Sequence, residues 1–112
     1  MPDYFLAPKP DDNEIAKYGF DGTEIHPRIA STNGTPKYVV LRPDGEFAVG
    51  RTDDQIEYYS ADGTRQWTQG VYGRIESLSF YNGTGDLYCA AAASVFRFDT
   101  TDGSEVFRAI PD

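Results

Sequence analysis

Few side chains in this 112-residue chain could carry out acid–base or nucleophilic chemistry. There is one histidine, His26, followed directly by Pro27, and one cysteine, Cys89. A catalytic triad needs an imidazole oriented by a carboxylate beside an activated nucleophile, and the sequence has no Gly-x-Ser-x-Gly turn to supply a serine. Cys89 lies in the apolar run 87–91, where a small buried hydrophobic residue is expected rather than a reactive thiol. We therefore expect no catalytic residues and no enzyme activity.

Carboxylates are the more abundant candidate ligands, because the chain has 18 aspartates and glutamates. Calcium prefers such oxygen ligands, but no segment has the spaced Asp-x-Asp-x-Asp-Gly loop of a calcium site. A zinc site would need at least two carboxylates, because only one His and one Cys are available. The clustered acids stand where turns favour aspartate, at Asp11, Asp12, Asp53, Asp54, Asp62, Asp99 and Asp102. We expect no metal site and no cofactor.

Charge excludes several classes of partner. The formal net charge is -8, whereas binding to a polyanion depends on Lys and Arg neutralising phosphates, so we expect no nucleic-acid partner. The same charge disfavours anionic membrane surfaces. Residues 1–4 have neither a basic region nor an apolar segment, so we expect no secretion signal. The expected localisation is cytoplasmic on synthesis, with incorporation into a virion as a further destination.

One pattern recurs three times along the chain. Segments that begin at Ile15, Ile56 and Val95 each place an aromatic residue three positions later and then an Asp-Gly turn. The first two starting points are 41 positions apart and the last two are 39 apart. Such self-similarity is typical of repeat architectures.

Further shared segments precede these repeats, at 4–7, 46–50 and 86–90, and again at 38–45 and 77–85. All are short, rich in β-branched and aromatic residues, and bounded by Asp, Gly, Asn or Pro, which predicts strands joined by hairpins. No interval of ten residues shows a clean 3.6-residue period, so we expect little or no helix.

The pattern resembles the blades of a β-propeller, of the NHL, YVTN and quinoprotein-like kinds. The resemblance rests on the turn Pro43–Gly45, the strand Glu46–Val49, the strand Ile56–Tyr59 and the turn Asp62–Thr64. It implies an all-β fold of antiparallel, four-stranded, blade-like repeats of about 40 residues, forming an incomplete propeller. The Gly-His and Trp-Asp marks of WD repeats and the tryptophan-docking motifs of quinoprotein blades are absent from the sequence.

The resemblance divides a single domain, 1–112, into about 2.5 to 3 blades. The predicted parts are a partial repeat at 4–20, repeats at 24–60 and 65–99, and a partial repeat at 105–110. Propellers usually close with four to eight blades, so we expect open strand edges that pair with another protein, in a homo-oligomer or a larger assembly. A single open or sandwiched sheet that closes by its own packing is the alternative. The residues expected at the interface are Tyr4, Phe5, Leu6, Val106, Phe107 and Ile110.

Two functions follow from this interpretation. The first is a non-enzymatic structural or assembly protein that self-associates or docks on a larger complex, such as a capsid decoration or tail protein of a virion. The alternative is a small oligomeric glycan-binding lectin, in which Trp67, Tyr72 and Tyr81 would stack on sugar rings.

Overall fold

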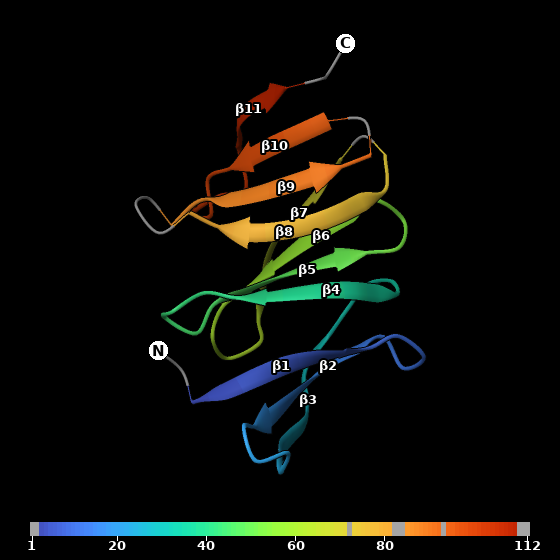
Figure 1. The fold of residues 1–112 in the computed structure, drawn as a ribbon, viewed down its shortest axis with the longest axis vertical. Coiled ribbons are helices and arrows are strands. Elements are labelled where there is room, and N and C mark those ends of the chain that lie inside the picture. The colour runs from blue at the N-terminus through green and yellow to red at the C-terminus, as the bar shows by residue number, and fades with distance from the viewer. Residues whose placement is uncertain (1–2, 72, 82–84, 93, 110–112) are drawn as a thin grey trace.

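Three antiparallel sheets follow one another along the long axis of the molecule (Figure 1). The computed structural model describes residues 3–71, 73–81, 85–92 and 94–109. In these ranges all of the regular secondary structure is β-strand, which confirms the all-β prediction. Over the same ranges no helix long and apolar enough to cross a membrane is found.

Hydrogen bonding groups the strands into one three-stranded and two four-stranded sheets. The first sheet contains β1 (Tyr4–Lys9), β2 (Glu14–Gly19) and β3 (Glu24–Ser31), in that order. The second contains β4 (Pro36–Leu41), β5 (Phe47–Arg51), β6 (Gln55–Tyr59) and β7 (Arg65–Gly70), and the third contains β8 (Ile75–Phe80), β9 (Leu87–Ala91), β10 (Ser94–Phe98) and β11 (Glu105–Ala109). The strands therefore form three sheets and not the single open or sandwiched sheet of the alternative.

The recurring Asp-Gly pairs form the tight turns before β3, β7 and β11. In the turn before β7, Asp62 accepts a hydrogen bond from the backbone N–H of Thr64, and Gly63 adopts a φ of 89°. A side-chain acceptor two residues upstream and a glycine at positive φ are what such a turn requires. The same arrangement recurs before β3 and before β11.

The structure corrects the predicted assignment of strands to repeats by one strand. The sequence division joined 24–31 to the repeat that follows it, but β3 pairs with β2 in the preceding sheet. Likewise 65–70 pairs with β6, and 105–110, predicted to be a lone strand, pairs with β10 over residues 105–109. The physical reason is that a tight Asp-Gly turn folds the next strand back onto the previous one as a hairpin.

The C-terminal end of the chain therefore differs from expectation, whereas the N-terminal end has the open strand edge that the sequence predicts. Within the described residues β11 is the outermost strand of a complete four-stranded sheet, as β7 is in the second sheet. At the other end β1 pairs only with β2, whereas the equivalent strand β5 lies between β4 and β6. Pro8 lies in β1, and proline is tolerated in edge strands because they have no neighbour on one side.

Two cores lie between the sheets. The first and second sheets bury Leu6, Ile15, Ala30, Phe47, Val49 and Tyr59 between them. The second and third sheets bury Ala48, Ile56, Tyr58, Ile75, Leu87, Cys89, Phe96 and Phe98. Because side chains alternate along a strand, the second sheet contributes one face to each core.

Cys89 should be unreactive in the folded protein. It is fully buried between the second and third sheets, and burial raises the pKa of its thiol to about 11. At pH 8 we expect a thiol reagent such as dithionitrobenzoate to react only as the chain unfolds, and promptly in concentrated urea. Prompt, stoichiometric labelling without denaturant would show that this core is open.

Candidate interaction surface

An aromatic pair on the second sheet forms the centre of its contact with the first sheet. Phe47 and Tyr59 are cross-strand partners whose rings stack with centroids 5.0 Å apart and planes 6° apart. Their exposed fractions are 0% and 1%, because Leu6, Ile15 and Ala30 of the first sheet cover them. Apolar area removed from water in this way is the main source of attraction between the sheets.

Polar groups complete the same contact. The Tyr59 hydroxyl donates a hydrogen bond to the carbonyl oxygen of Ser31, 3.1 Å away in the first sheet. Glu57 is fully buried, and its Oε2 accepts hydrogen bonds from Arg51 Nη1 at 2.8 Å and from the backbone N of Asn33 at 2.9 Å. A buried carboxylate needs such partners, since an unpaired charge would be strongly destabilising.

A tryptophan joins the second sheet to the third. The rings of Trp67 and Tyr58 stack at 5.1 Å, and the indole N–H of Trp67 donates a hydrogen bond to the carbonyl of Thr100 at 3.0 Å. The indole also lies over Gly103, because a Cβ built on that glycine would lie 2.5 Å from the ring. Trp67 therefore fixes the turn before β11 against β7, with both its ring and its polar atom used inside the protein.

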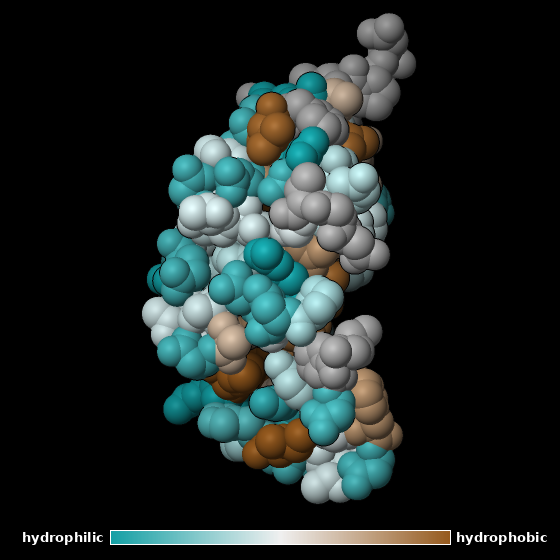
Figure 2. Space-filling view, turned by 90° about the vertical axis from the view of Figure 1, so that its left-hand side faces the viewer, coloured by the Kyte–Doolittle hydropathy of each residue, from teal (hydrophilic) through white to brown (hydrophobic). Residues whose placement is uncertain are grey.

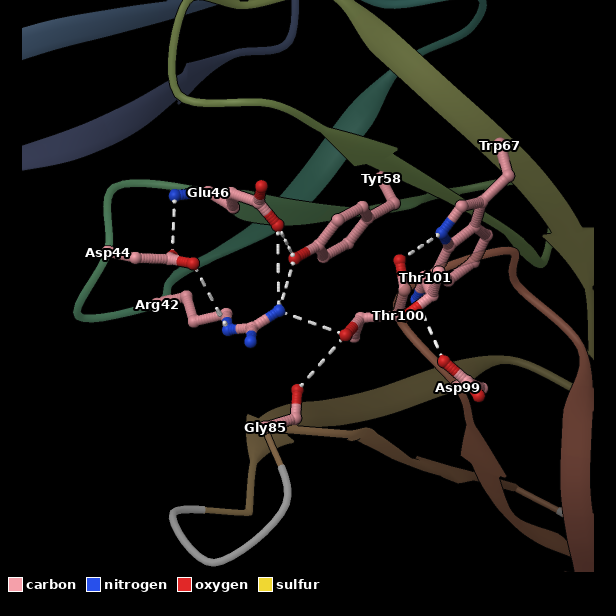
Figure 3. A network of polar contacts seen from close by, with 9 residues as sticks. All are labelled: Arg42, Asp44, Glu46, Tyr58, Trp67, Gly85, Asp99, Thr100 and Thr101. Atoms are coloured by element: carbon pink, nitrogen blue, oxygen red, sulfur yellow. Dashed lines mark hydrogen bonds and ion pairs between the residues drawn. The ribbon is translucent and has the colours of Figure 1, made fainter.

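Arg42 makes a second connection between these sheets (Figure 3). It lies in the turn between β4 and β5, and its Nη1 donates to the Tyr58 hydroxyl at 3.0 Å and to Thr100 Oγ1 at 2.9 Å. Tyr58 in turn donates to Glu46. Gly85, in the third sheet's β8–β9 turn, leaves room for the guanidinium, since a Cβ there would lie 2.7 Å from Arg42 Nη2.

A groove of about 560 Å³ opens beside this network. Its lining is polar and carries one cationic and four acidic side chains among Arg42, Asp44, Glu46, Tyr58, Gln66, Asp86, Asp99, Thr100 and Thr101. Across the described ranges no three His, Cys, Asp or Glu side chains are grouped so as to hold a metal ion. The groove is bordered by groups that already bond to one another and hold two sheets together.

The space around each turn glycine shows whether a neighbouring sheet covers that turn. A Cβ on Gly63 would lie 1.9 Å from the backbone oxygen of Ile29 in β3, and a Cβ on Gly103 would strike Trp67 in β7. Each glycine is thus covered by the outermost strand of the preceding sheet. Gly22 is the equivalent glycine of the first sheet, with a φ of 87°, and its Cβ would meet nothing within 4 Å.

The first sheet displays an uncovered copy of the buried aromatic pair. Phe5 and Tyr18 occupy the repeat positions of Phe47 and Tyr59, are cross-strand partners, and stack with ring centroids 5.6 Å apart. Phe20 extends the stack at 6.3 Å from Phe5. However, Phe5 is 42% exposed and Phe20 is 71% exposed. Tyr18 and Ala7 beside them are half-buried. We call this surface, made of Phe5, Ala7, Tyr18, Phe20 and the bare turn at Gly22, the back face of the first sheet.

Exposed apolar side chains gather on the two end sheets. In Figure 2 hydrophobic atoms reach the surface toward both ends of the long axis, where the first and third sheets lie. Among the described residues the large exposed hydrophobic side chains are Phe5, Phe20 and Ile25 at one end and Tyr81, Val95 and Val106 at the other. The middle sheet contributes none of them, because both of its faces are covered.

Comparisons with known proteins identify the fold. No protein-family model and no curated protein matches the sequence. Solved structures do match: the WD40 β-propeller domain of Doa1 (TM-score 0.79, 18% identity) and U3-55K (TM-score 0.80, 21% identity), each over 97% of this chain. BBS1N, solved in complex with ARL6DN, matches over 96% of the chain with a TM-score of 0.70 and 16% identity. The three sheets are blades of a β-propeller.

The match confirms the resemblance found in the sequence, although the WD signatures are absent. The chain spans little more than a third of each similar chain, namely 37%, 36% and 35%. In propeller terms β4 and β8 are the innermost strands of the second and third blades, and the first blade has three described strands, equivalent to β5, β6 and β7. Three blades are fewer than a closed propeller contains.

The predicted interface residues differ in their exposure in the structure. Phe5 and Val106 are exposed, but Leu6 is only 9% exposed and lies in the core between the first two blades. Tyr4 packs against that core, beneath the ammonium of Lys17. The backbone of Phe107 pairs with Arg97 in the third blade. Ile110 lies outside the described residues, as does Tyr72.

The predicted ligand-stacking residues also differ in their surroundings. Trp67 is engaged between two blades, whereas Tyr81 is 53% exposed and contacts Tyr88 edge to face. His26 is exposed in β3, where its Nδ1 accepts a hydrogen bond from the backbone N of Arg28. Sequence reasoning missed Tyr18, Phe20 and Gly22 as parts of one surface, although comparison of Phe5 with Phe47 across the repeats could have indicated it.

Replacing Arg42 by lysine should destabilise the contact between the second and third blades. Lysine cannot reproduce the bonds of the guanidinium to Tyr58 and Thr100, and the loss of such bonds costs roughly 1–3 kcal/mol in the free energy of unfolding. The matched control is Arg74→Lys, since Arg74 pairs with Glu76 at the exposed surface and should change stability by less than about 0.5 kcal/mol. Urea denaturation measures both, and equal effects would contradict the assigned role.

Alkaline pH should unfold the protein through its buried tyrosines. Burial raises the pKa of Tyr58 to about 12, with the hydrogen bond to Glu46 adding to the effect, and burial likewise raises the pKa of Tyr59. The neutral phenol is favoured in the folded state, so its stabilisation is complete below the ordinary pKa of about 10 and is lost as pH rises toward 12. Absorbance at 295 nm and far-UV circular dichroism, followed together, should show late-ionising tyrosines that titrate as the sheets unfold. Ionisation of all 8 tyrosines near pH 10 with the sheets intact would contradict this.

Proposed function

We propose that this chain is a non-enzymatic assembly module that binds another polypeptide through the back face of its first blade. One observation carries the proposal: this face has the aromatic pair and the turn glycine that the second blade buries against the first, whereas the third blade has Leu87 and Phe98 at the positions of the pair. Phe47 and Tyr59 are 0% and 1% exposed, whereas Phe5, at the position of Phe47, is 42% exposed. The back face therefore has the composition of an interface without a cover.

The energetics favour a protein as the occupant. Contiguous exposed apolar patches are uncommon on monomeric proteins and mark interaction sites. Phe5, Tyr18 and Phe20 form a stacked row, and the free energy gained on covering them comes from removing apolar area from water. A flat sheet face with a bare glycine turn beside it suits a second sheet, because the two internal contacts between blades are built in this way.

Other partners have less support. The ring of Trp67 stacks on Tyr58 and lies over Gly103, so its faces are used inside the protein and we do not propose a lectin. One similar structure, BBS1N, was solved in complex with a second protein, which is a precedent for protein binding by this fold. The virion setting predicted from the sequence stays a prediction.

Photo-crosslinking tests the proposal directly. A benzoylphenylalanine at position 5 should form an adduct with a second polypeptide when the chain is expressed in its native source, because the back face is covered there. The matched control is position 68, which is exposed in β7 of the middle blade and should give little adduct. Peptide mapping should place the partner's residue on an apolar sheet surface. Equal adduct yields at the two positions, or none at position 5, would overturn the proposal.

A further inference from the structure

The third blade presents the surface that the back face of the first blade lacks. Inside the protein each back face is covered by the opposite face of the preceding blade, which we call its forward face. Ile15 supplies the centre of the forward face in the first blade and Ile56 in the second, and both are 0% exposed. Val95 occupies the same position of the repeat in the third blade and is 37% exposed. The two uncovered faces are therefore of opposite, complementary kinds.

Several side chains besides Val95 make up the forward face of the third blade. Register places Val95 opposite Ala90 and Arg97 opposite Tyr88 on neighbouring strands, so all four side chains share one face of the blade. Arg97 stands at the repeat position of Tyr58 and forms an ion pair with Asp86 at 2.8 Å. Tyr81 contacts Tyr88 beside them. The surface is apolar at its centre with one compensated charge, as expected of a face that is covered after folding.

The outermost strand of the third blade completes the proposed contact. In the internal contacts, β3 covers Gly63 and β7 covers Gly103. The strand equivalent to these in the third blade is β11, and Gly22 of the first blade is the turn glycine that no strand covers. A third blade placed on the back face would bring β11 over Gly22.

We infer that the partner is a second copy of this chain, and that two copies close head to tail into a six-bladed ring. This inference rests on the proposed function and names its partner. Each copy places the forward face of its third blade on the back face of the other copy's first blade, so a twofold axis relates two identical contacts. Three blades from each copy give six, within the four to eight blades with which propellers close, whereas three copies would give nine. A head-to-tail contact that closes leaves neither face uncovered.

The mass of the purified chain in solution tests the inference. Light scattering or native mass spectrometry at micromolar concentration should give twice the 12.4 kDa of one chain. Phe5→Asp places a charge on the back face and Val95→Asp places one on the forward face, and each should yield a monomer. Thr68→Asp, at an exposed strand position of the middle blade, is the matched control and should remain a dimer. Far-UV circular dichroism establishes that each variant is folded.

Mixing the two variants tests the head-to-tail geometry. When Phe5→Asp and Val95→Asp chains pair, both charges fall in one contact and the other contact is wild type, so a 1:1 mixture should regain dimers that neither variant forms alone. Sensitivity to Phe5→Asp but not to Val95→Asp would instead indicate a back-to-back contact and overturn the inference.

The outcomes distinguish this inference from the proposed function. A wild-type chain that is monomeric at high micromolar concentration, or that forms open-ended filaments, overturns the closed pair of copies. If position 5 nevertheless crosslinks to a different polypeptide, the proposed function stands with another partner. If position 5 crosslinks to nothing, both fail.

Discussion

Everything in this structure depends on one sheet covering the face of the next. Each blade is a thin layer with two faces, and it can bury an apolar face only against a neighbouring blade. The second blade shows the arrangement complete, with Phe47 and Tyr59 buried on one side and Ile56 and Tyr58 on the other. Stability is therefore shared between adjacent blades, as expected for repeat proteins, and each end face is left without that contribution.

Polar contacts fix the position of each blade relative to its neighbour, although they do not supply most of the attraction between the blades. Arg42 reaches Thr100 from the turn between β4 and β5, and Trp67 reaches it from β7, so the third blade is held from two different elements. Between the first two blades, the buried Glu57 is paired with Arg51 and with the backbone of Asn33. Such pairs are costly when broken, because removal of one partner leaves the other buried without compensation.

Much of the architecture could be read from the sequence, because Asp-Gly turns and aromatic positions recur at nearly constant spacing. The strands predicted around Glu46–Val49 and Ile56–Tyr59 are present as β5 and β6. Which strands share a sheet could not be read in this way, since a repeat fixes the period but not where the sheet begins. The back face was only partly predicted: Phe5 was expected at an interface, but its stacking with Tyr18 and the bare Gly22 depend on long-range pairing.

The central claim is that a second copy of the chain covers the first blade's back face, as a neighbouring blade covers the back faces inside the protein. Hydroxyl-radical footprinting at increasing protein concentration tests it most directly, because oxidation of each aromatic ring reports its exposure to water. Oxidation of Phe5 and Phe20 should fall toward that of buried Phe47 as the concentration rises, with Phe47 protected throughout. Oxidation of Phe5 and Phe20 that is equally high at every concentration would contradict the account.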